Sequence, residues 1–119
     1  MFLQVLRAKI HRARVTAADL NYEGSITIDE TLMEAAGILP YERVQILNLS
    51  NGERAETYVI KGNPDSGEIV LNGAIARLAQ VGDLVIILSY GFVEEEKSAL
   101  ITPVVVLVDE NNSIIRVQS

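Results

Sequence analysis

The sequence predicts an all-β domain whose strands close into a barrel, with only a little helix. About eight short segments carry strand patterns, turn-forming residues separate them at short intervals, and two brief stretches can form helix. Short strands at this spacing favour a closed barrel over an open sheet, because closure removes exposed strand edges. A chain of 119 residues is expected to form one domain, residues 1–119.

The first third of the chain predicts three strands and a helix. Residues 2–10 alternate roughly between apolar and polar side chains, and residues 13–20 follow as a second strand that runs into a turn. Residues 25–29 alternate strictly, which is typical of a half-buried strand. Asp29 is then expected to cap a short helix that ends at Gly37.

The middle of the chain predicts a hairpin and a further strand. Residues 43–50 and 53–60 have strand patterns, and the Asn-Gly pair between them is the strongest hairpin signal in the sequence. Residues 61–68 consist mostly of turn formers and therefore predict a loop. Residues 69–73 predict the next strand, which ends at a glycine.

The last third predicts three more strands. Residues 74–80 can form one or two helical turns, and the strongly apolar residues 84–90 follow as a strand. A charged loop over 93–97 precedes a strand at 103–110. Two asparagines then turn the chain into a final strand over 113–119.

The composition favours a protein that assembles with copies of itself. Hydrophobic residues make up 49% of the chain, yet aromatic residues make up only 5%, so branched aliphatic residues and alanine supply most of the apolar surface. A small chain this apolar is expected to cover part of its surface in a homo-oligomer. No apolar run approaches the length that spans a membrane, and the cytoplasm is the expected location.

The charge and the rare residue types exclude several classes of function. A net charge of −6 argues against nucleic-acid binding, which needs a basic surface. The basic residues that do occur cluster at 7–14, where a solvated strand face is the simplest interpretation. The absence of cysteine excludes disulfides and thiol chemistry, and one histidine excludes a metal site built from several. No metal site is expected.

The candidate chemistry lies at the Gly24-Ser25 pair, at the mouth of the strand over 25–29. No nucleotide loop or nucleophile elbow is present, and nothing brings a Ser-His-Asp triad together. A serine hydroxyl can, however, attack the carbonyl that precedes it, and elimination and hydrolysis then leave a pyruvoyl group. Glycine before the serine favours such cleavage because it has no side chain to block the attack. The pair alone fits an ordinary turn or bulge equally well.

Five segments, in order along nearly the whole chain, resemble bacterial aspartate 1-decarboxylase, a pyruvoyl enzyme: "KIHRARVTAADLNYEGSITID", "AAGILPYE", "NGERAETYVI", "LNGAIA" and "GDLVIILSY". The resemblance implies a double-psi β-barrel and a homotetramer with active sites between subunits. It implies cleavage after Gly24 into a β chain, 1–24, and an α chain, 25–119. The implied reaction converts L-aspartate to β-alanine and CO2, a step of pantothenate biosynthesis.

The resemblance also assigns roles within the implied site. Ser25 matches the residue that becomes the pyruvoyl group, whose carbonyl forms an imine with the substrate amine and draws electrons from the breaking bond. Tyr58 matches the proton donor, and Arg54 matches the arginine that binds a substrate carboxylate. Thr57 matches a residue that supports self-cleavage and lies at the substrate site. Strict alternation would put Thr57 on the face opposite Tyr58, so a bulge or bend is expected there.

The remaining matches are substrate-binding positions: Lys9, His11, Asn72, Gly73, Ala74 and Ile75. Ile75 departs from the small residue that is usual in the family. If this position contacts substrate through its backbone, the larger side chain costs nothing. If the side chain faces the pocket, it narrows the site.

Two alternatives stay open at this stage. One is a non-catalytic β-barrel oligomer that never matures, which Ile75 alone favours. The other is a pyruvoyl decarboxylase for another amino acid such as glutamate. One methylene changes binding discrimination by only about 1–3 kcal/mol, which a sequence does not reveal.

Overall fold

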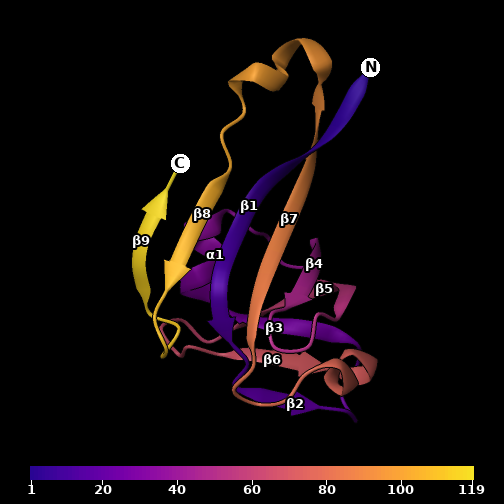
Figure 1. The fold of residues 1–119 in the computed structure, drawn as a ribbon, viewed down its shortest axis with the longest axis vertical. Helices are drawn as coiled ribbons and strands as arrows, with labels where there is room; N and C mark the ends of the chain where they lie inside the picture. Colours follow the sequence, from indigo (N-terminus) through magenta and orange to yellow (C-terminus); the bar gives the residue numbers. More distant parts are fainter.

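Nine strands form one hydrogen-bonded array in the order β2-β6-β3-β5-β4-β7-β1-β8-β9 (Figure 1). The structure is a computed structural model that describes all 119 residues. The strands are β1 (Phe2–Arg14), β2 (Ala17–Asp19), β3 (Ser25–Asp29), β4 (Arg43–Asn48), β5 (Arg54–Gly62), β6 (Ile69–Asn72), β7 (Leu84–Glu94), β8 (Val104–Val108) and β9 (Ile114–Gln118). The helical segments are α1 (Glu30–Ala36) and two 3₁₀ turns, η1 (Gly73–Leu78) and η2 (Glu95–Leu100).

The array curls until strands from its two halves meet. The backbone N–H of Thr16, just after β1, donates to the carbonyl of Ile69 at the start of β6, at 2.9 Å. In the strand order, β1 and β6 lie five positions apart, so this bond joins distant parts of the array. The predicted all-β fold with little helix is confirmed.

The core of the barrel is aliphatic, as the composition indicated. Its 20 buried residues are Ala, Val, Ile and Leu with one Met, and no aromatic side chain belongs to it. Ile10, Ile26, Ile69 and Ile87 come from four different strands and are fully buried. Branched side chains on the inner faces of strands pack well against one another, which explains why so small a chain can do without aromatic residues.

The predicted helix cap is confirmed. The Asp29 side chain accepts from the backbone N–H of Thr31 at 2.8 Å, and Gly37 ends α1 in the left-handed conformation. Asp29 is also buried and accepts from the N–H of Gly67 at 2.9 Å. One carboxylate therefore starts the helix and fixes the loop between β5 and β6.

Several predicted boundaries were wrong, and the largest differences arise because pairing between distant strands overrides local pattern. β1 continues to Arg14 in one strand, so the predicted strand at 13–20 shrinks to the three residues of β2. β7 continues to Glu94, where residues 84–90 were predicted, because it pairs with β1 along its length. The charged segment that follows is the 3₁₀ turn η2.

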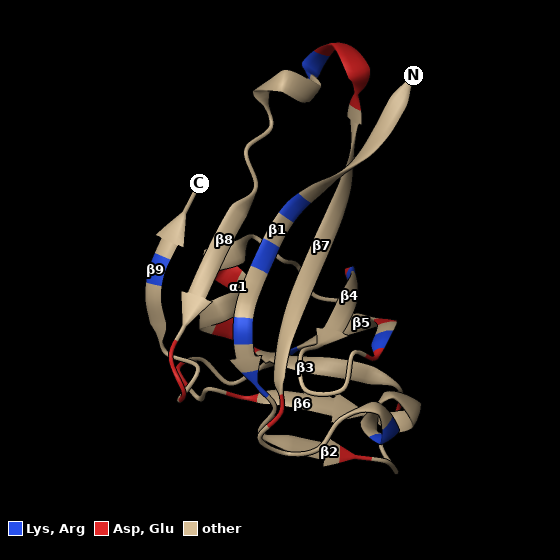
Figure 2. Ribbon diagram, viewed as in Figure 1, with Lys and Arg blue, Asp and Glu red and all other residues tan.

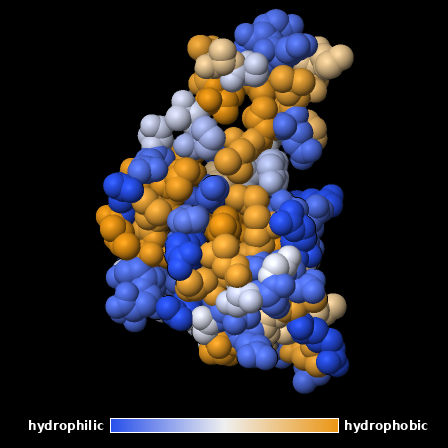
Figure 3. All heavy atoms as spheres, viewed as in Figure 1, coloured by the Kyte–Doolittle hydropathy of each residue, from blue (hydrophilic) through white to orange (hydrophobic).

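The far ends of β1 and β7 project from the barrel as an arm (Figure 1). The arm exposes apolar side chains that a lone barrel would normally bury: Phe2 is 66% exposed, Phe92 75% and Leu100 80%. The space-filling view shows apolar side chains on the surface at the arm and again along the β8–β9 side (Figure 3). None of the helices is long and apolar enough to cross a membrane.

Candidate active site

Ser25 begins β3 and is fully buried, although the four residues before it are exposed. Its hydroxyl donates to the carbonyl of Glu23 at 3.1 Å and accepts from the side-chain amide of Asn72 at 3.0 Å. The register of β3 and β6 makes Ser25 and Asn72 direct neighbours. A predicted nucleophile and a predicted site residue therefore meet on adjacent strands.

Asn72 makes a second contact that the sequence analysis missed. The same amide nitrogen donates to the hydroxyl of Thr27 at 3.0 Å. Thr27 lies two residues after Ser25 on β3, on the same face of the strand. The sequence shows that Ser25 and Thr27 share a face of the strand, but it does not show that β6, which carries Asn72, lies beside that strand.

Gly73 lies directly against the predicted cleavage junction. Its φ is +73°, and a Cβ at this position would lie 2.7 Å from the Cα of Gly24 and 2.9 Å from its nitrogen. Real Cβ atoms do not approach backbone this closely. Gly24 therefore packs so closely against residue 73 that only glycine fits at position 73.

The outer face of β5 carries two of the predicted residues. Arg54, Glu56 and Tyr58 are exposed, while Ala55 and Thr57 between them are half-buried. The predicted alternation is confirmed, but the predicted bulge at Thr57 is wrong. The register between β4 and β5 runs without a shift from Arg54 to Tyr58, so Thr57 and Tyr58 do lie on opposite faces.

β5 instead changes partner directly after Tyr58. Residues 54–58 pair with β4, and from Val59 onward β5 pairs with β3. Because Val59 is level with Ile26, Tyr58 is level with Ser25. The exchange of partners thus brings the predicted proton donor to the same end of β3 as the predicted nucleophile.

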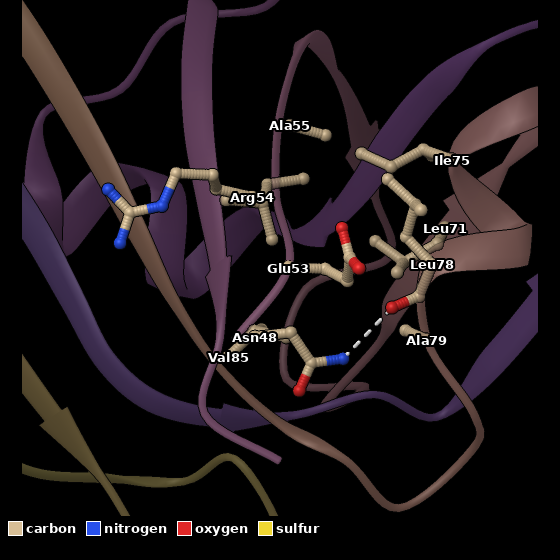
Figure 4. Close-up of a pocket in the computed structure, with 10 residues that line it drawn as sticks. Asn48, Glu53, Arg54, Ala55, Leu71, Ile75, Leu78, Ala79 and Val85 are labelled. Atoms are coloured by element: carbon tan, nitrogen blue, oxygen red, sulfur yellow. Dashed lines mark hydrogen bonds between the residues drawn. The ribbon is translucent and has the colours of Figure 1, made fainter. Parts of the chain in front are cut away.

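Arg54 has no carboxylate partner. Glu56, its neighbour on the same face, is paired with Arg43 of β4. Figure 4 shows the Arg54 guanidinium extending away from Leu71, Ile75 and Leu78, the apolar side chains beside it. An arginine whose fork is free of protein carboxylates can take a carboxylate from a ligand.

The loop after Asn72 resolves the question that Ile75 raised. Ala74 is exposed, whereas Ile75 is 8% exposed and belongs to the aliphatic core. Its side chain lines a small apolar pocket with Leu71 and Leu78, next to the hydrogen bond from Asn48 to the Leu78 carbonyl (Figure 4). Within this chain, the larger side chain therefore fills the core under the loop.

Lys9 and His11 do not join the group around Ser25. Both lie on β1, four positions from β3 in the strand order, within the row of basic residues along that strand (Figure 2). Neither forms an ion pair, and the Nδ1 atom of His11 is buried without a hydrogen-bond partner. Burial, and then the charges of Lys9 and Arg12, lower the pKa of His11 below its ordinary value.

A bulge in β1 lies directly at His11. Between Ile10 and Ala13 the register with β7 shifts, and Arg12 has a φ of +64°. Such bulges redirect the side chains around them. The predicted site residues therefore form one group at Ser25, Asn72, Gly73 and β5, and a second group on β1.

Comparisons with known proteins are consistent with this geometry. A family model described as aspartate decarboxylase matches residues 1–115. A protein of Caldicellulosiruptor saccharolyticus named aspartate 1-decarboxylase is 59% identical over 119 residues, covering 100% of this chain and 93% of its own. One of Lactiplantibacillus plantarum with the same name is 60% identical over 114 residues, covering 96% and 88%.

A solved structure supports the topology. The computationally designed protein msDPBB_sym2 aligns with a TM-score of 0.50 and 24% identity, covering 71% of this chain and 96% of that one. This likeness concerns the fold alone. The double-psi β-barrel that the sequence resemblance implied is confirmed.

Proposed function

The chain belongs to the aspartate decarboxylase family, and we propose that it cleaves itself at Gly24–Ser25 and then converts L-aspartate to β-alanine and CO2. The product would serve pantothenate biosynthesis, and the cytoplasm is the compartment where we expect this reaction. The observation that carries the proposal is the setting of Ser25. A fully buried serine follows a glycine that rests on Gly73, and its hydroxyl accepts a hydrogen bond from Asn72.

Cleavage needs only groups of this chain and one water. The Ser25 oxygen bonds to the Gly24 carbonyl carbon, the Gly24–Ser25 C–N bond breaks, and the hydroxyl proton ends on the Ser25 nitrogen. Loss of the Ser25 α-proton then forms a Cα=Cβ double bond, breaks the Cβ–Oγ bond of Ser25 and releases Gly24 as a carboxylate that keeps the serine oxygen. Water replaces the remaining nitrogen, which leaves as ammonia. The products are residues 1–24 and a chain from 25 that begins with a pyruvoyl group.

The residues present fit a pyruvoyl group at position 25. Asn72 can donate to an oxygen there, as it does to the Ser25 hydroxyl, and Gly73 leaves room at the junction. A pyruvoyl carbonyl supplies the electron sink that ordinary side chains lack. We assign Thr57, half-buried on β5, to the support of self-cleavage on the family resemblance alone.

Arg54 and Tyr58 are proposed to handle the substrate. Arg54 has a guanidinium fork with no protein carboxylate on it, which suits a carboxylate of aspartate. Tyr58 is level with Ser25 at the start of β3, and its phenol O–H is a proton donor. Tyr58 would donate that proton to the carbon that loses CO2. Ala74 and Ile75 would contact substrate through their backbone.

We propose that Lys9 and His11 act in a neighbouring subunit's site within a homotetramer. In one chain neither residue forms a hydrogen bond or an ion pair with the group around Ser25; Lys9 has no carboxylate partner, and the Nδ1 atom of His11 has no hydrogen-bond partner. The exposed Phe2, Phe92 and Leu100 of the arm supply apolar surface for assembly. A second subunit would complete the site, and sedimentation of the purified protein measures whether four chains assemble.

The proposed activity is tested by measuring β-alanine formed from L-aspartate by the purified protein and by its Ser25→Ala variant. The expected result is product from the first and none from the second, because alanine has no hydroxyl to start the cleavage. L-Glutamate serves as the competing substrate in the same assay. Higher kcat/KM with glutamate would contradict the assignment to aspartate, and no product from either substrate would contradict decarboxylation.

A further inference from the structure

We propose that Thr27 is a positioning residue for the self-cleavage and that it acts through Asn72. This inference rests on the proposed cleavage at Gly24–Ser25. Thr27 does not touch the bond that breaks. Its hydroxyl instead fixes the amide that contacts the nucleophile.

The hydrogen bonds around Asn72 are consistent with one orientation of its side-chain amide, with the nitrogen toward Ser25 and Thr27. The Ser25 hydroxyl has a single proton, which it donates to the carbonyl of Glu23. Its oxygen can then only accept from Asn72, so the amide must present nitrogen and not oxygen to Ser25. The second hydrogen on that nitrogen is the one that Thr27 accepts, at 3.0 Å.

The hydrogen bond from Asn72 to Ser25 favours the attack. An N–H directed at the serine oxygen stabilises the negative charge that develops there as the proton leaves. The terminal torsion of an asparagine side chain is broad, so one hydrogen bond alone would leave the amide free to rotate. The bond to Thr27 is the second point that fixes the rotation.

Thr27 is itself fixed by the strand on its other side. Its methyl carbon lies 3.1 Å from where a Cβ on Gly62 of β5 would be, so the methyl group packs over that glycine. The hydroxyl faces Asn72 on β6, the opposite neighbour of β3. A β-branched side chain has few χ1 options, so packing of the methyl group sets the direction of the hydroxyl.

Valine at position 27 would keep the shape and remove the acceptor. One amide hydrogen of Asn72 would then face a methyl group, and the amide would gain by rotating toward another acceptor. That rotation would take the N–H away from Ser25. Serine at position 27 would keep the acceptor and lose only the methyl group.

The test is the rate of cleavage of the full chain, followed by the intact mass of denatured samples from the earliest purified time point. We expect Thr27→Val to slow cleavage roughly 10- to 100-fold, less than the roughly 10²–10³-fold typical of deleting a stabilising donor outright. Thr27→Ser should cleave within about threefold of the unaltered chain, since the hydrogen bond remains. Thermal unfolding of each variant in a Ser25→Ala background measures any loss of stability separately from cleavage.

Thr16→Val is the matched control. The Thr16 hydroxyl also makes two hydrogen bonds to β6, at Ile69, but it does not contact Asn72. Equal rates for Thr27→Val and the unaltered chain would overturn the inference. So would slowing by Thr16→Val or Thr27→Ser as large as that by Thr27→Val, because the effect would then be general loosening. An unaltered chain that never cleaves would instead overturn the proposed function, and this inference with it.

Discussion

Gly73 lies against the proposed cleavage junction, where a side chain would collide with Gly24. Alanine there would adopt a φ of +73° and place its Cβ 2.7 Å from the Cα of Gly24. We expect Gly73→Ala to displace residues 22–24 from Ser25 and to slow cleavage at least tenfold. Displacing a reacting group by about 1 Å lowers a reaction rate roughly 10²-fold. Intact mass against time measures the rate.

Gly52→Ala separates this steric effect from backbone strain. Gly52 has a φ of +77° in the turn between β4 and β5, and nothing lies within 4 Å of its would-be Cβ. In both variants alanine must adopt a left-handed backbone conformation, which costs about 1–2 kcal/mol of stability. Only the Cβ of Gly73→Ala also collides with Gly24. Similar cleavage rates for the two variants would contradict a specific role of Gly73.

Tyr58→Phe tests the assignment of the proton donor. The ring stays and only the hydroxyl is removed, so the variant should fold and cleave normally. Its kcat for β-alanine formation should fall roughly 10²–10⁴-fold, the usual loss for a general acid. Tyr90→Phe, which removes an exposed hydroxyl bonded to Gln45, is the control and should keep its kcat. A fully cleaved Tyr58→Phe protein with normal turnover would show that another group supplies the proton.

Part of the site could be predicted residue by residue, and part could not. The Gly24-Ser25 pair and Asn72 were identified from family motifs, and the pairing of β3 with β6 does bring Ser25 and Asn72 together. Thr27 was missed because the family segment that contains it assigns it no role, and its importance depends on which strand lies beside β3. The position of Lys9 and His11, away from Ser25, follows from a strand order that local pattern does not encode.

At the scale of elements, the features that a few adjacent residues determine could be predicted from the sequence. The cap at Asp29, the stop at Gly37 and the hairpin of β4 and β5 are confirmed, because each depends on a few adjacent residues, although the connection runs from 49 to 53 and is longer than the Asn-Gly pair alone. The bulge expected at Thr57 was wrong. β5 keeps its regular alternation through Thr57 and Tyr58 and then changes its partner strand from β4 to β3. That exchange, after Tyr58, depends on pairing with β3 across more than 30 residues of sequence.

Glu42, a half-buried carboxylate, links β1, β7 and the loop before β4. Glu42 accepts from Ser89 of β7 and from Arg7 of β1, and its other oxygen accepts from the backbone N–H of Leu39 at 3.1 Å. Burial alone would raise the pKa of Glu42, but the hydrogen bonds from Ser89, Leu39 and Arg7 outweigh burial and leave the pKa lowered. The ionised form is therefore the one that stabilises the fold.

A lowered carboxyl pKa makes the stabilisation depend on pH in a defined direction. The contribution of Glu42 is complete above the ordinary glutamate pKa of about 4.3 and is lost as the pH falls through the lower pKa of the folded state. In a Ser25→Ala background, we expect Glu42→Gln to lower the free energy of unfolding by about 1–3 kcal/mol at pH 7. Urea unfolding should show this difference shrinking below about pH 4. A difference that stays constant from pH 7 to pH 3 would contradict the role of the charge.

At the scale of the whole molecule, the proposed homotetramer would complete what one barrel leaves open. The arm of β1 and β7 exposes phenylalanines, and the basic row on β1 lies far from Ser25 in the strand order. The protein carries a net charge of −6, so an anionic substrate needs local positive potential to approach. Arg54 is the proposed source within one subunit, and Lys9 of a neighbouring subunit is the proposed second source.

The central claim is that the bond between Gly24 and Ser25 breaks and leaves a carbonyl at position 25. The most direct measurement is the intact mass of the purified protein under denaturing conditions. We expect two chains, residues 1–24 and 25–119, and the longer one should be lighter by one ammonia than the same chain beginning with serine. Ser25→Ala should give one chain at the full 13.0 kDa. A single intact chain in the unaltered protein that persists on prolonged warming, or cleavage of Ser25→Ala at the same bond, would contradict the account.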